Sequence, residues 1–405
     1  VMELNQVIKL KLKTTDEQLV LFKDVTEQYR KACNYVSEYI FDNDFELNSF
    51  KLSKLLYHEI REEFRLKSQL AQSVFRTVTA RYKTTQTQLQ QKPFKYQDES
   101  GKWCRIYKDL NWLTKPVYFK RPQADLIRNR DYSFIEGGSV LSINTLESRV
   151  RTTFNTKGFD HYMDGSWSFG TAKLVQLKKN WFLHISVSKT VPDFNKENLN
   201  HVVGIDRGLN FLTVSYDEKG KTYFTDGRKI MKKRENYNKV RAELQSKGTK
   251  SAKRRLKKLA QRENRWMTDV NHRLSKTLVN QYGEGTVFVL EDLVDVTFSV
   301  GHLSKKQRNK HRSWSFYQFE QFLDYKSRNN QSETVKVSAA YTSQRCPKCG
   351  TIDKSSRNHK THEYHCKNCK YRSNDDRIAA MNIQLLGTQW VSGNEKPKFE
   401  KIITD

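Results

Sequence analysis

The segment His201-Val-Val-Gly-Ile-Asp-Arg-Gly208 decides how the second half of the chain is expected to fold. The four residues before its aspartate are apolar or small, which is typical of a buried strand. The aspartate, Asp206, would be costly to bury unless water or a cation reaches it, and Gly208 relaxes the backbone beside it. The segment therefore predicts a core strand that ends in a functional carboxylate.

Two further acids stand at the ends of predicted elements. Glu291 ends the apolar run Val287-Phe-Val-Leu290, and Asp376 lies at the beginning of a helix expected over residues 375–386. We refer to Asp206, Glu291 and Asp376 as the acid cluster. The remaining elements of this half are expected to be strands at residues 211–216, 221–225 and 334–339 and a helix at residues 313–329. Strands that precede helices in this order indicate an α/β layer of the RNase H type.

The acid cluster has a chemistry that three isolated carboxylates would not have. Carboxylates at one site repel one another and raise each other's pKa, and two Mg²⁺ ions would remove that penalty. Two such ions, about 3.5–4 Å apart, activate a water and stabilise the leaving oxygen of a phosphodiester. The alternative is that each acid merely ends a strand or caps a helix. Three nearby acids also compete as ligands: Asp292, Asp295 and Asp375. Asp375 is the most serious of them, since an acid at either position of the first turn favours the helix dipole.

Four cysteines form two close pairs, Cys346-Pro-Lys-Cys349 and Cys366-Lys-Asn-Cys369, separated by 16 residues. Each pair makes a tight knuckle, and four thiolates would complete a closed, tetrahedral shell around a structural Zn²⁺. A redox dithiol is the alternative, which two pairs at this separation disfavour. His359, His362 and His365 lie inside the loop, and we expect them to face solvent or nucleic acid rather than the metal.

The chain is strongly basic, because 73 lysines and arginines oppose 45 acids and give a formal net charge of +28. Nucleic acid is the favoured polyanionic partner, since its binding releases condensed counterions. An acidic membrane is the alternative, but no apolar run approaches the ~20 residues of a spanning helix. Residues 1–13 show no secretory signal, and paired cysteines indicate metal binding in a reducing compartment. We therefore expect a cytoplasmic protein, associated with the nucleoid when it is on DNA.

The basic residues concentrate in a predicted helical stretch over residues 228–276, which carries 18 lysines and arginines against 4 acids. Because few acids are available to pair with them at helical spacing, we expect this face to contact phosphate; a solvated face is the alternative. The candidate contacts are Lys253, Arg254, Arg255, Lys257 and Lys258. A second basic cluster covers residues 305–312.

The first half of the chain predicts a β structure that helices interrupt. Residues 7–13 alternate apolar and basic side chains, which is typical of a half-buried strand. The pattern is then helical to about residue 91, and residues 103–191 carry short β-like runs separated by glycine turns. We therefore expect a β-barrel or sandwich into which a helical segment is inserted.

With these motifs the chain resembles the TnpB family, nucleases encoded by insertion sequences and related to type V CRISPR effectors. The motifs that carry the resemblance are Gly204-Ile-Asp206-Arg-Gly208, Leu290-Glu291-Asp-Leu293, Thr342-Ser-Gln-Arg-Cys346-Pro-Lys-Cys349-Gly350, Cys366–Cys369 and Asp376-Arg-Ile-Ala-Ala-Met-Asn382. The family commonly has Asn where this chain has Ile378. The Ala-Ala-x-Asn register that follows nevertheless favours Asp376 over Asp375.

The resemblance implies an α+β multidomain protein. Its first half would be a wedge β-barrel (residues 1–14 and 103–197) with an inserted helical recognition domain (15–102). Its second half would be an RNase H-like, RuvC-like nuclease domain (198–340 and 371–390) with an inserted zinc ribbon-like module that binds target nucleic acid (341–370), followed by a polar tail (391–405).

The resemblance also implies an activity, that of an RNA-guided DNA endonuclease. The protein would bind a guide RNA, find double-stranded DNA beside a short target-adjacent motif, and pair the guide with its target. The acid cluster would hold two Mg²⁺ ions, or Mn²⁺, and hydrolyse the phosphodiester. The alternatives are a nuclease-inactive, RNA-guided regulator and an unguided RNase H-like nuclease or DNA-joining transposase. A miniature CRISPR effector would share nearly all of these sequence features.

Overall fold

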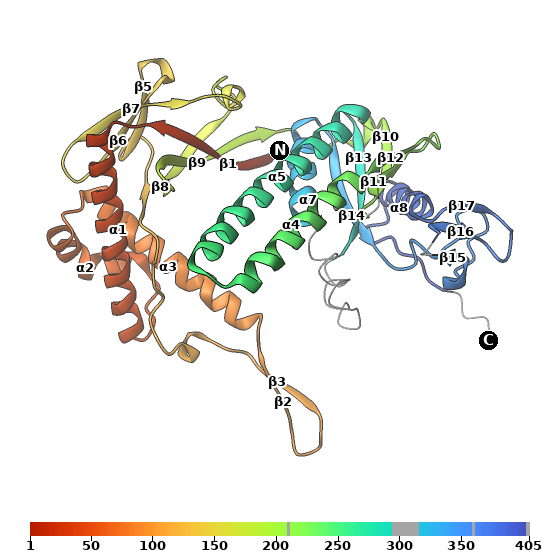
Figure 1. Cartoon of the computed structure of the whole chain (residues 1–405), viewed down its shortest axis with the longest axis horizontal. Helices are drawn as coiled ribbons and strands as arrows, with labels where there is room; N and C mark the ends of the chain where they lie inside the picture. Colours follow the sequence, from red (N-terminus) through yellow and green to blue (C-terminus); the bar gives the residue numbers. More distant parts are fainter. Residues whose placement is uncertain (209–210, 294–315, 359–360, 402–405) are drawn as a thin grey trace. The chain divides into compact units, whose positions relative to one another are not determined.

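The computed structural model describes residues 1–208, 211–293, 316–358 and 361–401 (Figure 1). The chain divides into two compact units. The first comprises Asn5–Lys189, and the second comprises Val1–Leu4 and Thr190–Asp405. No helix within the described ranges combines the length and the apolar character needed to cross a bilayer.

The unit Asn5–Lys189 combines a curved, nearly barrel-like sheet with three helices. The sheet has seven strands in the order β4-β8-β9-β1-β7-β6-β5. Their bounds are β1 (Met2–Lys13), β4 (Gln123–Leu126), β5 (Tyr132–Ile135), β6 (Val140–Asn144), β7 (Arg149–Asn155), β8 (Ser168–Leu177) and β9 (Asn180–Val191). The helices α1 (Asp16–Asp42), α2 (Ser49–Glu63) and α3 (Ser68–Gln90) all fall between β1 and β4 in the chain. Residues 16–90 are therefore helices that interrupt one sheet.

The N-termini of two of these helices follow from their capping residues. Thr15 and Gln18 form a reciprocal capping box at the beginning of α1, and the side chain of Asn48 accepts from two backbone N–H groups at the beginning of α2. A separate two-stranded hairpin, β2 (Phe94–Gln97) and β3 (Trp103–Ile106), follows α3.

The second unit is built on a five-stranded sheet in the order β12-β11-β10-β13-β14. Its strands are β10 (His201–Asp206), β11 (Phe211–Tyr216), β12 (Thr222–Asp226), β13 (Thr286–Asp292) and β14 (Glu333–Ser338). Strands β10, β13 and β14 run parallel, while β11 and β12 form an antiparallel meander beside β10. The strands predicted at residues 211–216, 221–225 and 334–339 correspond to β11, β12 and β14.

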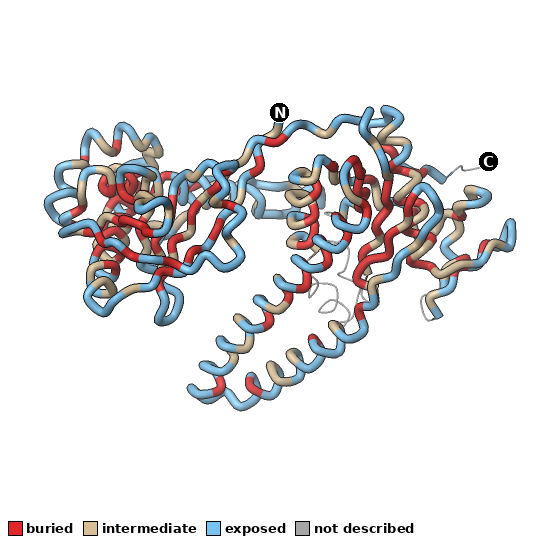
Figure 2. Tube along the Cα trace, turned by 90° about the horizontal axis from the view of Figure 1, so that it is seen from above, coloured by how far each residue is buried: buried red, intermediate tan, exposed pale blue. Residues whose placement is uncertain are grey.

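Alternate residues of the central strands fill the two faces of this sheet, and buried residues follow the strands in Figure 2. On one face, Val203 and Ile205 of β10 pack with residues of α5 (Lys250–Tyr282) and α7 (Phe316–Asn329). On the other face, Val202 packs with residues of α8 (Asp375–Val391). The sheet therefore lies between two helical layers.

Helix α8 approaches β10 very closely, and glycines make this possible. A Cβ atom on Gly204 would lie 2.2 Å from the backbone oxygen of Ala380, and one on Gly387 would lie 2.3 Å from a methyl carbon of Val289. Larger residues at either position would push the helix away from the sheet. Gly204 thus allows α8 to approach β10 closely around Ala380 and Gln384.

The helical stretch predicted over residues 228–276 is present and consists of two helices. Helix α4 (Arg228–Lys247) ends at Gly248, which has φ of 62°, and Thr249 caps α5. A left-handed residue is a common helix terminator, and glycine adopts it without a Cβ penalty.

Candidate active site and metal centre

The sheet brings two members of the acid cluster to one edge. Asp206 ends β10 and Glu291 lies near the end of β13, and the parallel register pairs Ile205 with Leu290, one residue before each acid. Side chains alternate along a strand. Asp206 therefore shares the face of Val202 and Gly204, and Glu291 shares that of Val287 and Val289, which is the face that α8 covers.

Helix α8 supplies the third acid from its first turn. Asn374 caps the helix, and its side chain accepts hydrogen bonds from the N–H groups of Asp376 and Arg377 at 3.0 and 3.1 Å. Asp376 is 8% exposed. The acid cluster thus joins three segments that are up to 170 residues apart in the chain.

The electrostatics of the cluster disfavour the ionised form of its three carboxyl groups. Burial, and then the charges of Glu291 and Asp376, raise the pKa of Asp206 well above its usual value. Burial also raises the pKa of Glu291 and of Asp376, the latter with help from Asp375. A divalent cation would reverse these shifts, because it favours the ionised carboxylates. The residues present therefore fit a cation site.

The ligand atoms of the acid cluster are spread more widely than those of two compact groups of possible metal ligands. Among the described residues, two groups bring their ligand atoms within 4.8 Å of one another: the four paired cysteines, and His362 with Asp375 and Asp376. The acid cluster is not one of these groups. A site for two ions about 3.5–4 Å apart needs a wider spread of oxygen atoms than a site for one.

Asp375 occupies a different position from Asp376. It is fully buried, and its Oδ2 accepts a hydrogen bond from Nε of Arg357 at 2.8 Å, while Nδ1 of His362 lies 3.4 Å from its Oδ1. Asp375 also contributes less than Asp376 to the raised pKa of Asp206. The geometry therefore favours Asp376 as the cluster's third acid. Asp292 is exposed at the end of β13, and Asp295 lies outside the described residues.

Two arginines that the sequence patterns did not single out supply charge near the cluster. Arg207 is buried; it donates to the backbone oxygen of Glu291 at 2.6 Å and to the Glu320 carboxylate at 3.2 Å. Arg357 places a guanidinium nitrogen 3.7 Å from Oδ1 of Asp376. Its charge lowers the pKa of Asp206, Glu291 and Asp376 against the larger effect of burial.

A hydrogen-bond chain links the acid cluster to the segment that leads to the cysteines. The hydroxyl of Thr342 donates to Oε1 of Glu291. The buried side chain of Asn382, on α8, donates to the backbone oxygens of Thr342 and Arg345 at 2.7 and 2.8 Å. Helix α8 therefore fixes the segment that carries Thr342, just before Cys346.

The four cysteines meet as predicted from their spacing. Sγ of Cys346 lies 3.6 Å from that of Cys369, and Sγ of Cys349 lies 3.6 Å from that of Cys366. Four thiolates around Zn²⁺ at ~2.3 Å would be about 3.8 Å apart, so the residues fit this ion. The knuckles have the same turn, because Gly350 N–H donates to Cys346 and Lys370 N–H to Cys366. The surrounding strands are β15 (Arg357–Asn358), β16 (Glu363–His365) and β17 (Arg372–Asn374).

The other predicted residues are placed as follows. Lys253, Arg254, Arg255, Lys257 and Lys258 are all exposed on α5. His365 is exposed on β16, whereas His362 lies beside the buried Asp375. The basic cluster at 305–312 and His359 lie outside the described residues.

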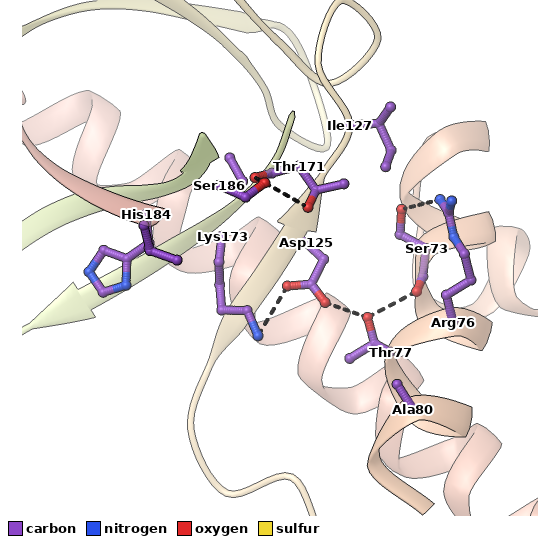
Figure 3. Close-up of a pocket in the computed structure, with 12 residues that line it drawn as sticks. Ser73, Arg76, Thr77, Ala80, Asp125, Ile127, Thr171, Lys173, His184 and Ser186 are labelled. Atoms are coloured by element: carbon purple, nitrogen blue, oxygen red, sulfur yellow. Dashed lines mark hydrogen bonds and ion pairs between the residues drawn. The ribbon is translucent and has the colours of Figure 1, made fainter. Parts of the chain in front are cut away.

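A cleft of about 470 Å³ lies in the unit Asn5–Lys189, between α3 and strands β4, β8 and β9 (Figure 3). Nζ of Lys173 lies 3.4 Å from the Asp125 carboxylate, which also accepts from the hydroxyl of Thr77 at 2.5 Å. Arg76 and His184 add basic groups to the lining. The sequence patterns indicated none of these residues, because they come from segments far apart in the chain.

The comparisons with known proteins agree with this architecture. The family Cas12f1-like, TNB domain, matches residues 316–383, and the family OrfB_IS605, described as a probable transposase, matches residues 184–294. A solved Cas12f1 in complex with single guide RNA and target DNA superposes with a TM-score of 0.58 at 13% identity, over 94% of this chain and 99% of that one. The chain therefore has the multidomain fold of the Cas12-type effectors.

Two relatives are similar in sequence as well. A TnpB-like protein of Methanocaldococcus jannaschii is 28% identical over 243 residues, which are 58% of this chain and 84% of that protein. The CRISPR-associated endodeoxyribonuclease Cas12f1 of Sulfoacidibacillus thermotolerans is 26% identical over 263 residues, 61% of this chain and 57% of that protein. The match thus covers just over half of that relative. The chain is a relative of TnpB-like and Cas12f1 proteins, and the predicted resemblance is confirmed.

Proposed function

We propose that the protein is an RNA-guided DNA endonuclease that hydrolyses phosphodiester bonds at the acid cluster. The observation that carries the proposal is the convergence of three partly or fully buried acids at one edge of an RNase H-type sheet, each with a raised pKa. Such perturbed groups mark functional sites more often than structural ones.

In this mechanism Asp206, Glu291 and Asp376 would hold two Mg²⁺ ions, and the chemistry that bound ions would supply is activation of a water and stabilisation of the leaving oxygen. Thr342 and Arg207 orient Glu291 through its carboxylate and its backbone. Arg357 favours the ionised carboxylates against the effect of burial, and its guanidinium lies 3.7 Å from Asp376. The cysteine site has no open coordination position, so its Zn²⁺ would be structural.

Guide RNA and duplex DNA are the proposed partners. The net charge of +28 and the exposed basic residues of α5 support phosphate contact. The cleft beside Asp125 offers donors and acceptors on a concave surface, and we propose that it contacts the edges of bases in the target-adjacent motif.

The experiment that tests the function begins with the RNA. The protein is expressed together with the DNA that flanks its gene, and the RNA that copurifies is sequenced. Its variable end is then replaced, and the complex is offered a plasmid library with randomised bases beside the new target. Cleavage that follows the new guide and requires Mg²⁺ supports the proposal. Nucleic-acid-free protein that cuts DNA equally well contradicts guidance.

A DNA-joining transposase is the second candidate, because one matching family is described as a probable transposase. Both activities use carboxylate-bound ions, but their products differ. Hydrolysis leaves free ends, whereas strand transfer leaves covalently joined DNA molecules, so sequencing of the products separates the two.

A further inference from the structure

The hairpin β2–β3 is a small sheet with an uncovered face. Its strands pair with each other and form a sheet of their own. Figure 1 draws this hairpin as a ribbon that extends beyond the end of α3. All of its residues are at least partly exposed. An isolated hairpin is marginally stable in water, so contact with a partner would stabilise it.

One face of the hairpin carries a row of aromatic rings. Phe94 and Tyr96 lie on the same face by alternation, and their ring centroids are 6.4 Å apart with planes at 21°. Trp112 continues the row, 6.2 Å from Phe94 with planes at 31°. These side chains are 48%, 40% and 46% exposed. The spacing is close to twice the ~3.4 Å rise between neighbouring bases of a strand.

The charges around the row are complementary to phosphate. Residues 92–120 contain seven lysines and arginines and three acids. Two of the acids are engaged locally: Asp98 accepts hydrogen bonds in the hairpin turn, and Asp109 caps the short 3-10 helix at Leu110–Trp112. Nζ of Lys108 lies 5.3 Å from the centroid of the Trp112 ring. Rings beside cations are the components of a stacking surface for unpaired bases.

We infer that the face formed by Phe94, Tyr96 and Trp112 is a stacking platform for unpaired bases of the guide RNA. The inference rests on the proposed function, which supplies the RNA. RNA is favoured over the displaced DNA strand, because a guide accompanies the protein throughout, whereas single-stranded DNA is present only after a target has opened. A permanent partner also fits an aromatic face that would otherwise remain in water. Proteins commonly bind unpaired RNA by stacking its bases on aromatic rings.

The first variant pair separates stacking from charge. Phe94→Ala with Trp112→Ala is expected to weaken binding of the copurifying RNA by about 5- to 100-fold per lost ring, with no change in the slope of log affinity against log salt. Trp103→Ala is the matched control, because Trp103 is 67% exposed but lies on the opposite face of the same hairpin. The control is expected to bind RNA as the wild type does.

A second pair of variants guards against simple unfolding of the hairpin. Phe94→Leu with Trp112→Leu keeps the face apolar and removes the rings, so it should lose affinity as well, and the same RNA bases should become reactive to a chemical probe of unpaired bases. Wild-type affinity in the leucine variant overturns the inference. The inference is also overturned if the variants lose affinity only for a fluorescent single-stranded DNA probe and not for the RNA. A change from dimer to monomer in the variants, measured by light scattering, would overturn it too, because it would show that a second copy of the chain covers the face.

Cleavage at saturating RNA distinguishes this inference from the proposed function. The alanine variant should still cut a guided target, because the acid cluster is unchanged. If the wild type binds RNA through this face but never cuts, the proposed nuclease fails and the platform stands. If the wild type cuts and the variants bind RNA normally, the platform fails alone.

Discussion

The acid cluster and the cysteine cluster are two candidate metal sites in one unit, and they are built in opposite ways. The cysteines come from two knuckles within 24 residues, and their sulfur atoms already lie within 4.8 Å of one another. The acids come from two strands and a helix, and burial raises the pKa of each. We propose that zinc at the cysteines would stabilise the local fold, whereas the acids, which burial disfavours in their ionised form, would need cations to remain ionised together. The proposed structural role of the cysteines and the proposed catalytic role of the acids follow from this contrast.

The largest expected effect is on cleavage. Asp206→Asn, Glu291→Gln and Asp376→Asn should each reduce guided cleavage by more than about 100-fold, because loss of an outer-sphere group alone costs ~10–100-fold. Guided DNA binding should persist, since pairing and basic residues hold the DNA. Gel-based cleavage and binding assays on the same preparations check this.

Asp292→Asn is the control for these variants, because Asp292 is an exposed acid at the end of the same strand as Glu291. It should cleave normally. If Asp375→Asn is inactive and Asp376→Asn is fully active, the third metal-binding acid is Asp375 and not Asp376. If all three cluster variants still cut, the acid cluster is not the nuclease site.

The second prediction concerns the melting temperature, which we expect a substitution in the acid cluster to raise and a substitution in the cysteine cluster to lower. The raised pKa of Asp206 means that the folded chain retains a proton which the unfolded chain releases, so stability is lost as pH rises from about 4 through the folded pKa. In metal-free protein at neutral pH, Asp206→Asn should therefore raise the melting temperature, by about 2–4 °C per kcal/mol.

Cys366→Ser should do the reverse. Loss of one thiolate opens the zinc site, and zinc binding in such modules is folding free energy. We expect the zinc content to fall and the melting temperature to drop by at least about 5 °C. Calorimetry and metal analysis of both variants, with the wild type as reference, test the signs together. A full complement of zinc in Cys366→Ser would contradict the proposed zinc site. A lower melting temperature of metal-free Asp206→Asn would contradict the proposal that burial of Asp206 destabilises the protein.

The same difference explains which parts were predictable from sequence. The two cysteines of each pair are three residues apart in the sequence, so their spacing alone predicts the tight turn that each pair forms. Asp206 and Glu291 could be predicted as site residues because each ends an apolar run, and parallel strands bring such ends together. Arg357 could not be predicted from the sequence, because its contact with Asp375 depends on how the loop between the cysteine pairs folds. The cleft residues Asp125 and His184 give no local signal, since they meet only in the folded sheet.

The helices α4 and α5 could be predicted from the sequence, but the break between them at Gly248 could not. The sequence predicts a helical stretch over residues 228–276, but its periodicity does not show that Gly248 adopts a left-handed conformation and ends the first helix. The exposed residues of α5 agree with a solvent-facing basic surface, while their contact with phosphate stays a prediction. The finer boundaries of wedge, recognition and nuclease domains also stay predictions.

A smaller effect should follow from Arg357→Gln. The guanidinium lowers the pKa of all three cluster acids, so its removal raises them further and leaves more of each carboxyl protonated at mildly acidic pH. Cleavage should therefore require higher pH, with the acidic limb of the rate profile moved up by about one unit. Rates measured from pH 5 to 9 at several Mg²⁺ concentrations test this. Arg357→Lys, which keeps the charge, should shift the limb less; an unshifted limb in the glutamine variant contradicts the electrostatic role.

The smallest expected effect comes from Thr342, the residue that joins the two sites. Its hydroxyl donates to Glu291, and this hydrogen bond lowers the pKa of that acid against the effect of burial. Thr342→Val keeps the shape of the side chain but removes the donor, so cleavage should fall by about 10-fold. The zinc content should not change, because Asn382 binds the backbone oxygen of residue 342 rather than its side chain. Thr342→Ser restores the donor and should restore most of the activity. If the valine variant loses zinc together with activity, the two sites form one structural unit and the contrast between them fails; if it cuts at the wild-type rate, Glu291 does not depend on this hydroxyl.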